Sequence, residues 1–253
     1  MASWFALLCT VDDEIEQMTG YAAQLSITES IAVLEHSASQ ANRRRSSLYI
    51  PKCTTCDTQR VSALTKAFVS QVRGLLPTHV YANLVKSITR VWQAMATEQS
   101  CRDLPIIDQK TFLSIRMRTV GLHPFYVLLS HAFKLSRWKP EVQSLLKELE
   151  TSLALAVGLQ NDMLGLSKDL DVGETFNFVV FGSRNGNDDL DSSLERAVAM
   201  HNAAVERAFD CWEEIGERCD ADSGQMRYAE SLLGFVASHF AWASKAERYA
   251  VDS

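Results

Sequence analysis

The chain has 253 residues, of which 47% are hydrophobic and 22% are charged, a composition typical of a globular protein. Its formal net charge of −6 argues against binding along a nucleic-acid backbone, and no apolar run approaches the ~20 residues of a membrane-spanning helix. We therefore expect neither a nucleic-acid partner nor stable membrane insertion. With only 5 Pro and 11 Gly, the sequence favours long helices over an all-β fold.

The first predicted helix covers residues 3–19 and ends in an acidic cluster just before Gly20. Asp12, Asp13 and Glu16 belong to this cluster. Because Asp12 and Glu16 lie one helical turn apart, they present two carboxylates that could share one cation. Taken alone, the cluster is more typical of a solvated helix end.

A second helix is predicted over residues 24–40, followed by a polar, irregular segment. We interpret Arg43–Arg45 in this segment as a surface loop, with a phosphate-recruiting lid as the alternative. Cys53 and Cys56 form a CxxC pair with no second pair and no nearby His, which argues against a zinc site. The scattered cysteines favour a reducing compartment, so we expect a cytoplasmic protein.

Proline separates the next three predicted helices, which cover residues 58–75, 79–99 and 108–119. The third is followed by a break at Gly121–Pro124, with Arg116 and Arg118 just before it. A break in an apolar region frees main-chain carbonyls, which must find partners nearby. Taken alone, this segment fits an ordinary corner between helices with surface arginines.

The most informative stretch is Val157–Val180, an apolar helical stripe interrupted by polar residues. Asn161, Gly165, Lys168 and Asp169 follow one another at i, i+4, i+7 and i+8. At about 100° per residue they project from one helix face. An amide oxygen, a carboxylate and an ammonium on a buried helix need partners, and a divalent cation with a polyanion would supply them. A solvated face with an Asp–Lys pair is the alternative.

The rest of the chain is predicted to be helical as well. A long helix over residues 140–170 carries the polar stripe, a turn-rich loop follows at 182–190, and two amphipathic helices cover 190–218 and 223–247. We find no repeat and no domain boundary. The sequence therefore predicts an all-α fold, with residues 1–253 forming a single domain of about eight to ten helices.

The chain resembles the class I terpene synthases, or terpene cyclases, a family of all-helical enzymes. The family's aspartate-rich motif, DDxx(D/E), is matched by DDEIE at Asp12–Glu16. Its second motif, ND(L/I/V)xSxxKE, is matched by NDMLGLSKD at Asn161–Asp169 with two departures. Gly165 replaces the family's Ser, and Asp169 replaces its Glu.

Further motifs extend the resemblance along almost the whole chain. Arg116 lies 45 positions before Asn161, close to the spacing of the family's diphosphate-sensing Arg. The segment RMRTVG at 116–121 resembles the sensor, linker and effector break of the family, and includes Thr119 and Gly121. The remaining matches are Gly173 with Asn177, and Trp242 with the pair Arg248–Tyr249.

The resemblance implies a class I terpene synthase site that ionises an isoprenyl diphosphate with three Mg²⁺ ions. Its implied metal-binding residues are Asp12, Asp13, Glu16, Asn161, Gly165 and Asp169, the two groups facing each other and Gly165 acting through a bound water. Its implied catalytic residues are Arg116, Lys168 and Arg248, which would neutralise the diphosphate, and Tyr249, which would donate a hydrogen bond to it. Its implied substrate-binding residues are Arg116, Thr119, Gly121, Phe5, Phe112, Phe178 and Trp242. The four aromatic residues fit a hydrophobic core as well as a pocket.

The leading hypothesis is a sesquiterpene cyclase acting on farnesyl diphosphate, the commonest substrate of such families. A chain-elongating isoprenyl diphosphate synthase would need a second Asp-rich motif, and the sequence has none. The alternative from another class is a non-catalytic helical binding protein, favoured by Gly165, by Asp169 and by the eleven residues that precede Asp12. That short beginning leaves fewer partners for the apolar side of helix 3–19, so we also expect a homodimer with N-terminal helices near the contact.

Overall fold

The structure is a computed structural model, and it describes residues 1–40, 58–102, 107–135, 140–185 and 188–246. Within these residues it contains eleven α-helices and no β-strand, so the predicted all-α fold class is confirmed. The chain divides into two compact units. Unit 1 comprises Met1–Leu104 with Gly121–Leu128, and unit 2 comprises Pro105–Val120 with Leu129–Ser253. The predicted single domain of residues 1–253 stays a prediction.

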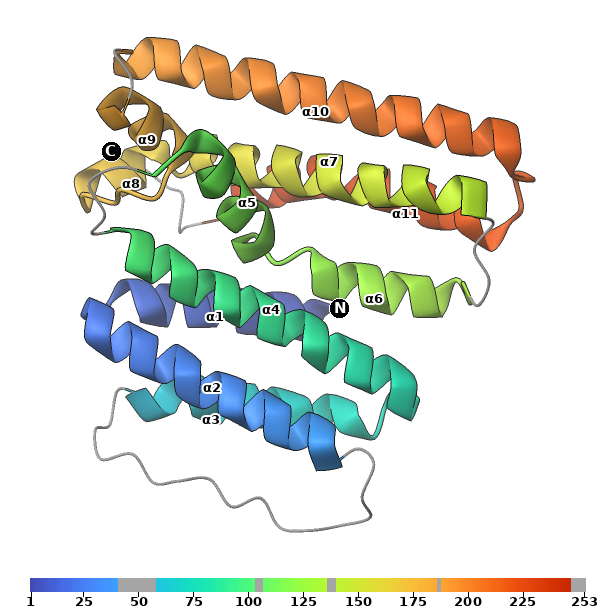
Figure 1. Ribbon diagram of the computed structural model, residues 1–253, viewed down its shortest axis with the longest axis horizontal. Helices are drawn as coiled ribbons and strands as arrows, with labels where there is room; N and C mark the ends of the chain where they lie inside the picture. The colour runs from blue at the N-terminus through green and yellow to red at the C-terminus, as the bar shows by residue number, and fades with distance from the viewer. Residues whose placement is uncertain (41–57, 103–106, 136–139, 186–187, 247–253) are drawn as a thin grey trace. The chain divides into compact units, whose positions relative to one another are not determined.

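Unit 1 is built from four helices and the beginning of a fifth. These are α1 (Ala2–Glu16), α2 (Gly20–Gln40), α3 (Thr58–Arg73), α4 (Thr78–Arg102) and the first part of α6 (His123–Ala132). Helix α2 packs against α3 and α4, and α1 packs against α3 (Figure 1). The side of α2 that faces its neighbours carries small and branched residues at helical spacing, including Ala23, Ile27, Ser30 and Leu34, all at most 1% exposed. Small side chains allow helices to pack closely.

Tryptophan residues fill the core of unit 1. Trp4 of α1 lies 5.6 Å from Trp92 of α4 and 6.2 Å from Phe68 of α3, measured between ring centroids. Leu8 and Val11 extend the same buried side of α1. The apolar side of this helix is therefore covered within its own chain. The homodimer, which was expected from an uncovered patch on this helix, stays a prediction.

Unit 2 is organised around one long helix, α7 (Pro140–Leu164). Helices α10 (Leu190–Arg218) and α11 (Gly224–Ala243) run alongside it, and α5 (Gln109–Thr119) packs against it (Figure 1). The buried positions of α10 are mostly small, namely Ser193, Ala197, Ala204, Ala208 and Cys211, together with Ile215. These small residues let α10 approach α7 closely.

Side-chain caps fix where three helices of unit 2 begin. Asp108, Asp189 and Ser223 precede α5, α10 and α11, and each accepts a hydrogen bond from the third main-chain N–H that follows it, at 2.9, 2.8 and 3.1 Å. Such caps satisfy main-chain donors that a helix leaves unpaired. The predicted beginnings of these helices are correct to within one residue. Helix α11 ends at Ala243, earlier than the predicted residue 247.

Two predictions about the region after α7 need correction. The helix predicted over 140–170 is divided at Gly165, where α7 ends and α8 (Leu166–Asp171) begins. The loop predicted at 182–190 begins inside another helix, α9 (Phe178–Asn185). Gly182 permits a close helix approach here and forms no turn. A Cβ atom at this position would lie 2.4 Å from Arg196 and 2.8 Å from Ser193, both on α10.

No helix in the described ranges is both long enough and apolar enough to cross a membrane.

Candidate functional site

The polar stripe of the sequence lies where α7 passes into α8. Gly165 has the right-handed dihedral angles φ −82° and ψ −5°. Its N–H donates to Asn161 O, and its own carbonyl accepts from Asp169 N, both at 2.9 Å. The helical repeat therefore continues through the boundary. Asn161, Gly165 and Asp169 consequently stay on one face, as the spacing predicts.

A buried ion pair joins this region to α5. Arg116 donates from Nε to Oδ1 of Asp162 at 2.8 Å, and its Nη2 lies 2.5 Å from the same oxygen. Asp162 is 0% exposed, and its Oδ2 accepts from the main-chain N–H of Phe178 at 3.1 Å. Burial raises the pKa of Asp162 to about 6, while Arg116 and the Phe178 N–H hold it down. The carboxyl group of Asp162 thus pairs with the guanidinium of Arg116 in a buried environment.

Sequence reasoning missed Asp162. It selected Arg116 for its distance from Asn161 and assigned it to a diphosphate, whereas the structure pairs it with the residue next to Asn161. A signal was present, because a carboxylate on an otherwise apolar helix needs a cationic partner. Arg116 is 46 residues away in the sequence, and only the packing of α5 on α7 brings the two together.

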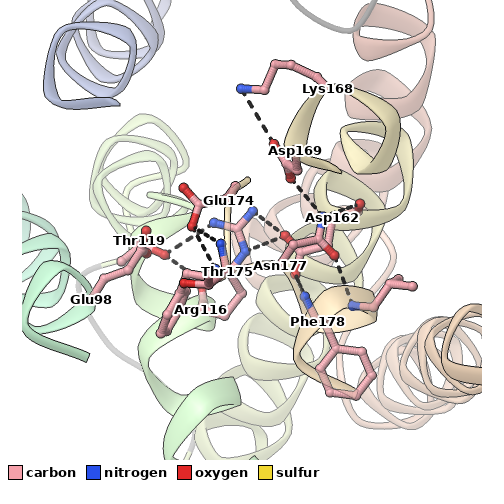
Figure 2. Close-up of polar contacts among 12 residues, drawn as sticks. Glu98, Arg116, Thr119, Asp162, Lys168, Asp169, Glu174, Thr175, Asn177 and Phe178 are labelled. Carbon is pink, nitrogen blue, oxygen red and sulfur yellow. Dashed lines mark hydrogen bonds and ion pairs between the residues drawn. The ribbon is translucent and has the colours of Figure 1, made fainter. Parts of the chain in front are cut away.

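Thr119 lies beside Arg116 at the end of α5. Its hydroxyl donates to the main-chain carbonyl of Arg116 at 3.3 Å, and Nη1 of Arg116 lies 3.5 Å from the same hydroxyl oxygen. Thr119 is only 6% exposed. These contacts help to hold the guanidinium in one orientation (Figure 2).

Asn177 joins three elements at the centre of the site. Its Nδ2 donates to the main-chain carbonyl of Asp162 at 2.7 Å and to Oδ2 of Asp169 at 2.8 Å. Its Oδ1 accepts from Val179 N at 2.9 Å, at the beginning of α9. Figure 2 shows Asn177 next to Asp162 and Asp169. Sequence reasoning noted Asn177 in a family pattern but gave it no role.

Asp169 contacts Asn177 through one carboxylate oxygen and faces Lys168 with the other. Lys168 Nζ lies 3.7 Å from Oδ1. Burial raises the pKa of Asp169, while the hydrogen bond from Asn177 and the charges of Lys168 and Arg116 lower it. Asp169 is thus a partly desolvated carboxylate, and the positive charges of Lys168 and Arg116 favour its ionised form.

A compact turn brings Asn177 back to the motif. Gly173 has φ +71°, and its N–H donates to Leu170 O at 3.2 Å. The N–H of Glu174 donates to Asp169 O at 2.7 Å, which completes a Schellman motif with Gly at its left-handed position. The Glu174 carboxylate then accepts from the next two main-chain N–H groups, at 2.8 and 2.7 Å.

The predicted pocket aromatics of unit 2 lie in a phenylalanine cluster. The ring of Phe112 lies 4.4 Å from Phe176, 5.9 Å from Phe178 and 4.6 Å from Phe181. Phe112 and Phe178 are 0% exposed, and the Arg196 guanidinium lies 5.9 Å above the Phe178 ring. Both residues contribute to the core of this unit, and their contact with a substrate stays a prediction.

The other two predicted aromatics lie elsewhere. Trp242 is half-buried near the end of α11, with its ring 5.8 Å from that of His239. His239 Nδ1 lies 2.7 Å from Oε1 of Gln160, the neighbour of Asn161. Phe5 belongs to α1 in unit 1 and is half-buried.

The aspartate-rich motif occupies the last turn of α1. Asp12 and Asp13 are half-buried and Glu16 is exposed, while Glu14 pairs with Arg60 of α3 at 2.9 Å. The motif thus belongs to unit 1, whereas Asn161–Asp169 belongs to unit 2. The predicted facing of the two motifs stays a prediction.

The break after α5 satisfies its freed carbonyl locally, as predicted. Gly121 has φ +71°, and its carbonyl accepts from the indole N–H of Trp4 at 3.0 Å. A Cβ atom at Gly121 would lie 2.5 Å from Cδ2 of Leu8. Glycine is therefore required here by both backbone conformation and space.

Several predicted features lie outside the described residues. They are the pair Arg248–Tyr249, the basic segment Arg43–Arg45, and the cysteines Cys53 and Cys56.

The donor set on α7 and α8 fits a hard divalent cation that brings further ligands with it. Asn161 offers an amide oxygen and Asp169 a carboxylate oxygen, the ligand types that Mg²⁺ prefers. Gly165 supplies no side-chain oxygen. Among the described residues, no three His, Cys, Asp or Glu side chains gather as a complete metal site. Mg²⁺ commonly completes its octahedron with water and substrate phosphate oxygens, so this incomplete set is compatible with it.

These helices define an all-α protein with a candidate metal-binding motif, rich in oxygen donors, at the α7–α8 boundary. Residues 3–207 match the family model described as "Terpene synthase family 2, C-terminal metal binding". The chain therefore belongs to the terpene synthase family. A search of the curated proteins found no match.

Solved structures share the fold of this chain. A cucumene synthase variant matches with a TM-score of 0.67 and 16% identity, covering 98% of this chain and 79% of that one. A structure of a-eudesmol synthase matches with a TM-score of 0.67 and 16% identity, covering 96% and 78%. Hedycaryol synthase in complex with nerolidol matches with a TM-score of 0.66 and 16% identity, covering 94% and 75%. At these identities the likeness concerns the fold.

Proposed function

We propose that this protein is a Mg²⁺-dependent class I terpene cyclase. It ionises an isoprenyl diphosphate, with farnesyl diphosphate as the preferred substrate, cyclises the carbocation to a sesquiterpene and releases diphosphate. The observation that carries the proposal is the buried ion pair between Arg116 and Asp162. Asp162 lies within the Asn161–Asp169 motif, and the chain belongs to the terpene synthase family. The C15 preference is supported by the similar solved structures, one of which holds nerolidol. We place the activity in the cytoplasm.

In this proposal Asn161 and Asp169 are metal ligands, with a water at Gly165 completing the shell. Asp12, Asp13 and Glu16 of the aspartate-rich motif provide the second set of ligands. Together these residues would hold three Mg²⁺ ions, which would supply the positive charge that offsets the diphosphate and the charge that develops as it leaves. The Asp169 carboxylate is already desolvated and oriented by Asn177, so little reorganisation accompanies cation binding.

Cationic side chains complete the binding of the diphosphate. Arg116 is held in one orientation by Asp162 and Thr119, and its planar fork suits a phosphate oxygen as well as a carboxylate. Lys168 adds a point charge next to Asp169. Arg248 and Tyr249 are proposed as further diphosphate contacts. Gly121 is proposed to contribute main-chain contacts to substrate at the break after α5.

Aromatic residues are proposed to surround the hydrocarbon chain. A carbocation must be kept from water, and aromatic faces stabilise it through cation–π attraction. Phe5, Phe112, Phe178 and Trp242 remain the candidates. Because Phe112 and Phe178 are fully buried, we assign them first to supporting the wall and second to contacting substrate.

The test is direct. The purified protein is incubated with geranyl, farnesyl and geranylgeranyl diphosphates plus Mg²⁺, and organic extracts are analysed by mass spectrometry. We expect a cyclic C15 product, released diphosphate, and loss of both on addition of EDTA. An Asn161→Ala variant serves as the control for contaminating activity. If no product forms from any of the three substrates, the proposed catalysis is wrong.

The alternative is a non-catalytic protein that binds Mg²⁺ and diphosphate. Two observations favour it. Gly165 supplies no hydroxyl, and one oxygen of Asp169 is already bonded to Asn177. Thermal denaturation separates the two functions: a melting temperature raised by Mg²⁺ with diphosphate, without product from any substrate, would support the alternative.

A further inference from the structure

Asn177 stands immediately before α9 and makes three hydrogen bonds from a side chain that is 0% exposed. Its Oδ1 accepts from Val179 N, the second residue of α9, in the manner of an N-terminal cap. Aspartate, serine or threonine would provide the same cap. The cap alone does not explain why this residue is an asparagine.

The two hydrogen bonds that Nδ2 of Asn177 donates explain why this residue is an asparagine. Nδ2 carries two hydrogens, and its two acceptors are the main-chain carbonyl of Asp162 at 2.7 Å and the Asp169 carboxylate at 2.8 Å. Among the good capping residues, asparagine is the one that accepts one bond and donates two from the same side chain. An aspartate at this position has no hydrogen to donate, so its carboxylate would repel both acceptor oxygens.

The contact with Asp169 has a geometric consequence. It holds Oδ2 toward α9, which leaves Oδ1 on the side of Lys168 Nζ, 3.7 Å away. Rotation of the Asp169 side chain would displace its oxygens relative to Asn161, and the hydrogen bond from Asn177 restricts that rotation. A cation ligand on a helix needs its orientation fixed by a second hydrogen bond, and such supporting contacts typically change metal affinity 10–100-fold.

We propose that Asn177 is a positioning residue that orients the Asp169 carboxylate for Mg²⁺ binding in the presence of diphosphate. The proposal rests on the function proposed above and deepens it. Asn177 donates to Oδ2 and directs Oδ1 outward as a single-oxygen ligand. It also ties α8 and α9 to the end of α7, so the ligand and its support share one rigid frame.

The test measures Mg²⁺ binding by calorimetry with saturating inorganic diphosphate, on the full chain and on cap-preserving variants. Asn177→Ser keeps a capping oxygen but does not reach Asp169, and Asn177→Asp keeps cap and shape but repels the carboxylate. We expect Asn177→Ser to weaken Mg²⁺ binding about tenfold and Asn177→Asp more strongly. Asn185→Ala is the matched control, because Asn185 is the last residue of α9, at the opposite end from Asn177, and donates to Phe181 O within that helix. It should bind Mg²⁺ as the wild type does.

A double-mutant cycle shows whether Asn177 acts through Asp169. In an Asp169→Ala background, Asn177→Ser should change Mg²⁺ affinity less than about twofold, since coupled residues are not additive. The Mg²⁺ concentration for half-maximal activity should rise for Asn177→Ser, with turnover at saturating Mg²⁺ close to wild type. Circular dichroism melting confirms that each variant is folded.

The outcomes separate the two proposals. If the wild type binds Mg²⁺ with diphosphate and Asp169→Ala binds it measurably more weakly, but both Asn177 variants bind as the wild type does, only the positioning role is wrong. If both Asn177 variants fail to fold, Asn177 serves the fold alone and the positioning role is also wrong. If the wild type itself binds no Mg²⁺ with diphosphate, the proposed function fails, and the inference built on it falls with it.

Discussion

Arg116 and Asp162, 46 residues apart in the sequence, form a buried ion pair between α5 and α7, with Nη2 2.5 Å from Oδ1. Their side chains are only 14% and 1% exposed. The second carboxylate oxygen binds the first main-chain N–H of α9. One aspartate of α7 thus ties together α5, which carries the proposed diphosphate sensor, and the beginning of α9.

Removing one partner of this pair should destabilise the protein strongly. Asp162→Ala leaves a guanidinium buried without its carboxylate, a change that costs about 3–5 kcal/mol in comparable pairs. Urea denaturation measures the loss in the free energy of unfolding. Glu148→Ala is the control, because it removes an exposed pair with Arg207 and should leave the unfolding midpoint nearly unchanged. Equal effects of the two substitutions would contradict the structural importance of the buried pair.

Substitutions of Arg116 should show whether its positive charge or its planar geometry is needed for activity. Arg116→Lys keeps the positive charge but loses the planar fork that contacts Asp162 and Thr119 together. We expect it to restore little of the activity lost in Arg116→Ala, measured as diphosphate release from farnesyl diphosphate. Near-full activity of Arg116→Lys would show that charge alone suffices.

The proposed metal ligands should be needed for turnover. Asn161→Ala and Asp12→Ala each remove an oxygen from the groups that stabilise the departing diphosphate, so turnover should fall about 100-fold or more. Single-turnover assays with farnesyl diphosphate at several Mg²⁺ concentrations measure this. Retention of near-full activity by either variant would show that the metal assignment at that residue is wrong.

Gly165 provides a test of the water proposed beside it. Gly165→Ser offers a hydroxyl in place of that water, so activity should persist and the Mg²⁺ requirement should fall or stay equal. Gly165→Leu fills the space between Asn161 and Asp169 and should abolish activity. The assay is the Mg²⁺ dependence of product formation. A fully active Gly165→Leu variant with unchanged Mg²⁺ dependence would exclude a metal on this face.

Gly121 and Gly173 have the same φ of +71°, but replacing them by alanine should lower the free energy of unfolding by different amounts. Gly173→Ala meets open space and should lose only the left-handed conformational penalty, about 1 kcal/mol. Gly121→Ala adds a clash with Leu8, whose Cδ2 would lie 2.5 Å from the new Cβ. The free energy of unfolding should therefore fall by more in Gly121→Ala than in Gly173→Ala. Thermal melts of both variants compare the two, and equal losses would mean that Leu8 moves aside freely.

The carboxyl of Glu150 in α7 makes stability depend on pH. Burial raises the pKa of Glu150, and a hydrogen bond from Tyr228 at 2.5 Å opposes that rise. The folded state therefore holds this proton more tightly than the unfolded chain does. The contribution to stability is greatest below the ordinary carboxyl pKa and is lost as the pH rises through the raised value.

Comparing unfolding free energies between pH 4 and pH 8 for the wild type and Glu150→Gln isolates this contribution. The glutamine variant keeps an acceptor for Tyr228 without a titrating proton, so it should gain stability relative to the wild type as the pH rises. Tyr228→Phe removes the hydrogen bond that opposes the rise, so the total loss of stability should be larger and should extend to higher pH. A constant difference between wild type and Glu150→Gln at all pH values would contradict a raised pKa.

Local sequence was sufficient for the helices and for the face that carries the motif. Helix α10 begins and ends where its pattern predicts, at Leu190 and Arg218, because the Asp189 cap and the apolar periodicity are local properties. The common face of Asn161, Gly165 and Asp169 follows in the same way from 3.6 residues per turn. Motifs matched in order along the chain likewise indicated the family.

Tertiary structure decided which groups these residues contact. Neither the pairing of Arg116 with Asp162 nor the two donor bonds of Asn177 follows from spacing, because each joins separate elements. Gly182, predicted to form a turn, instead gives room to Arg196 of α10. Helical periodicity specifies the direction of a side chain from its own axis. Its partner depends on which helix packs there, and that is set by the burial of apolar surface over the whole unit.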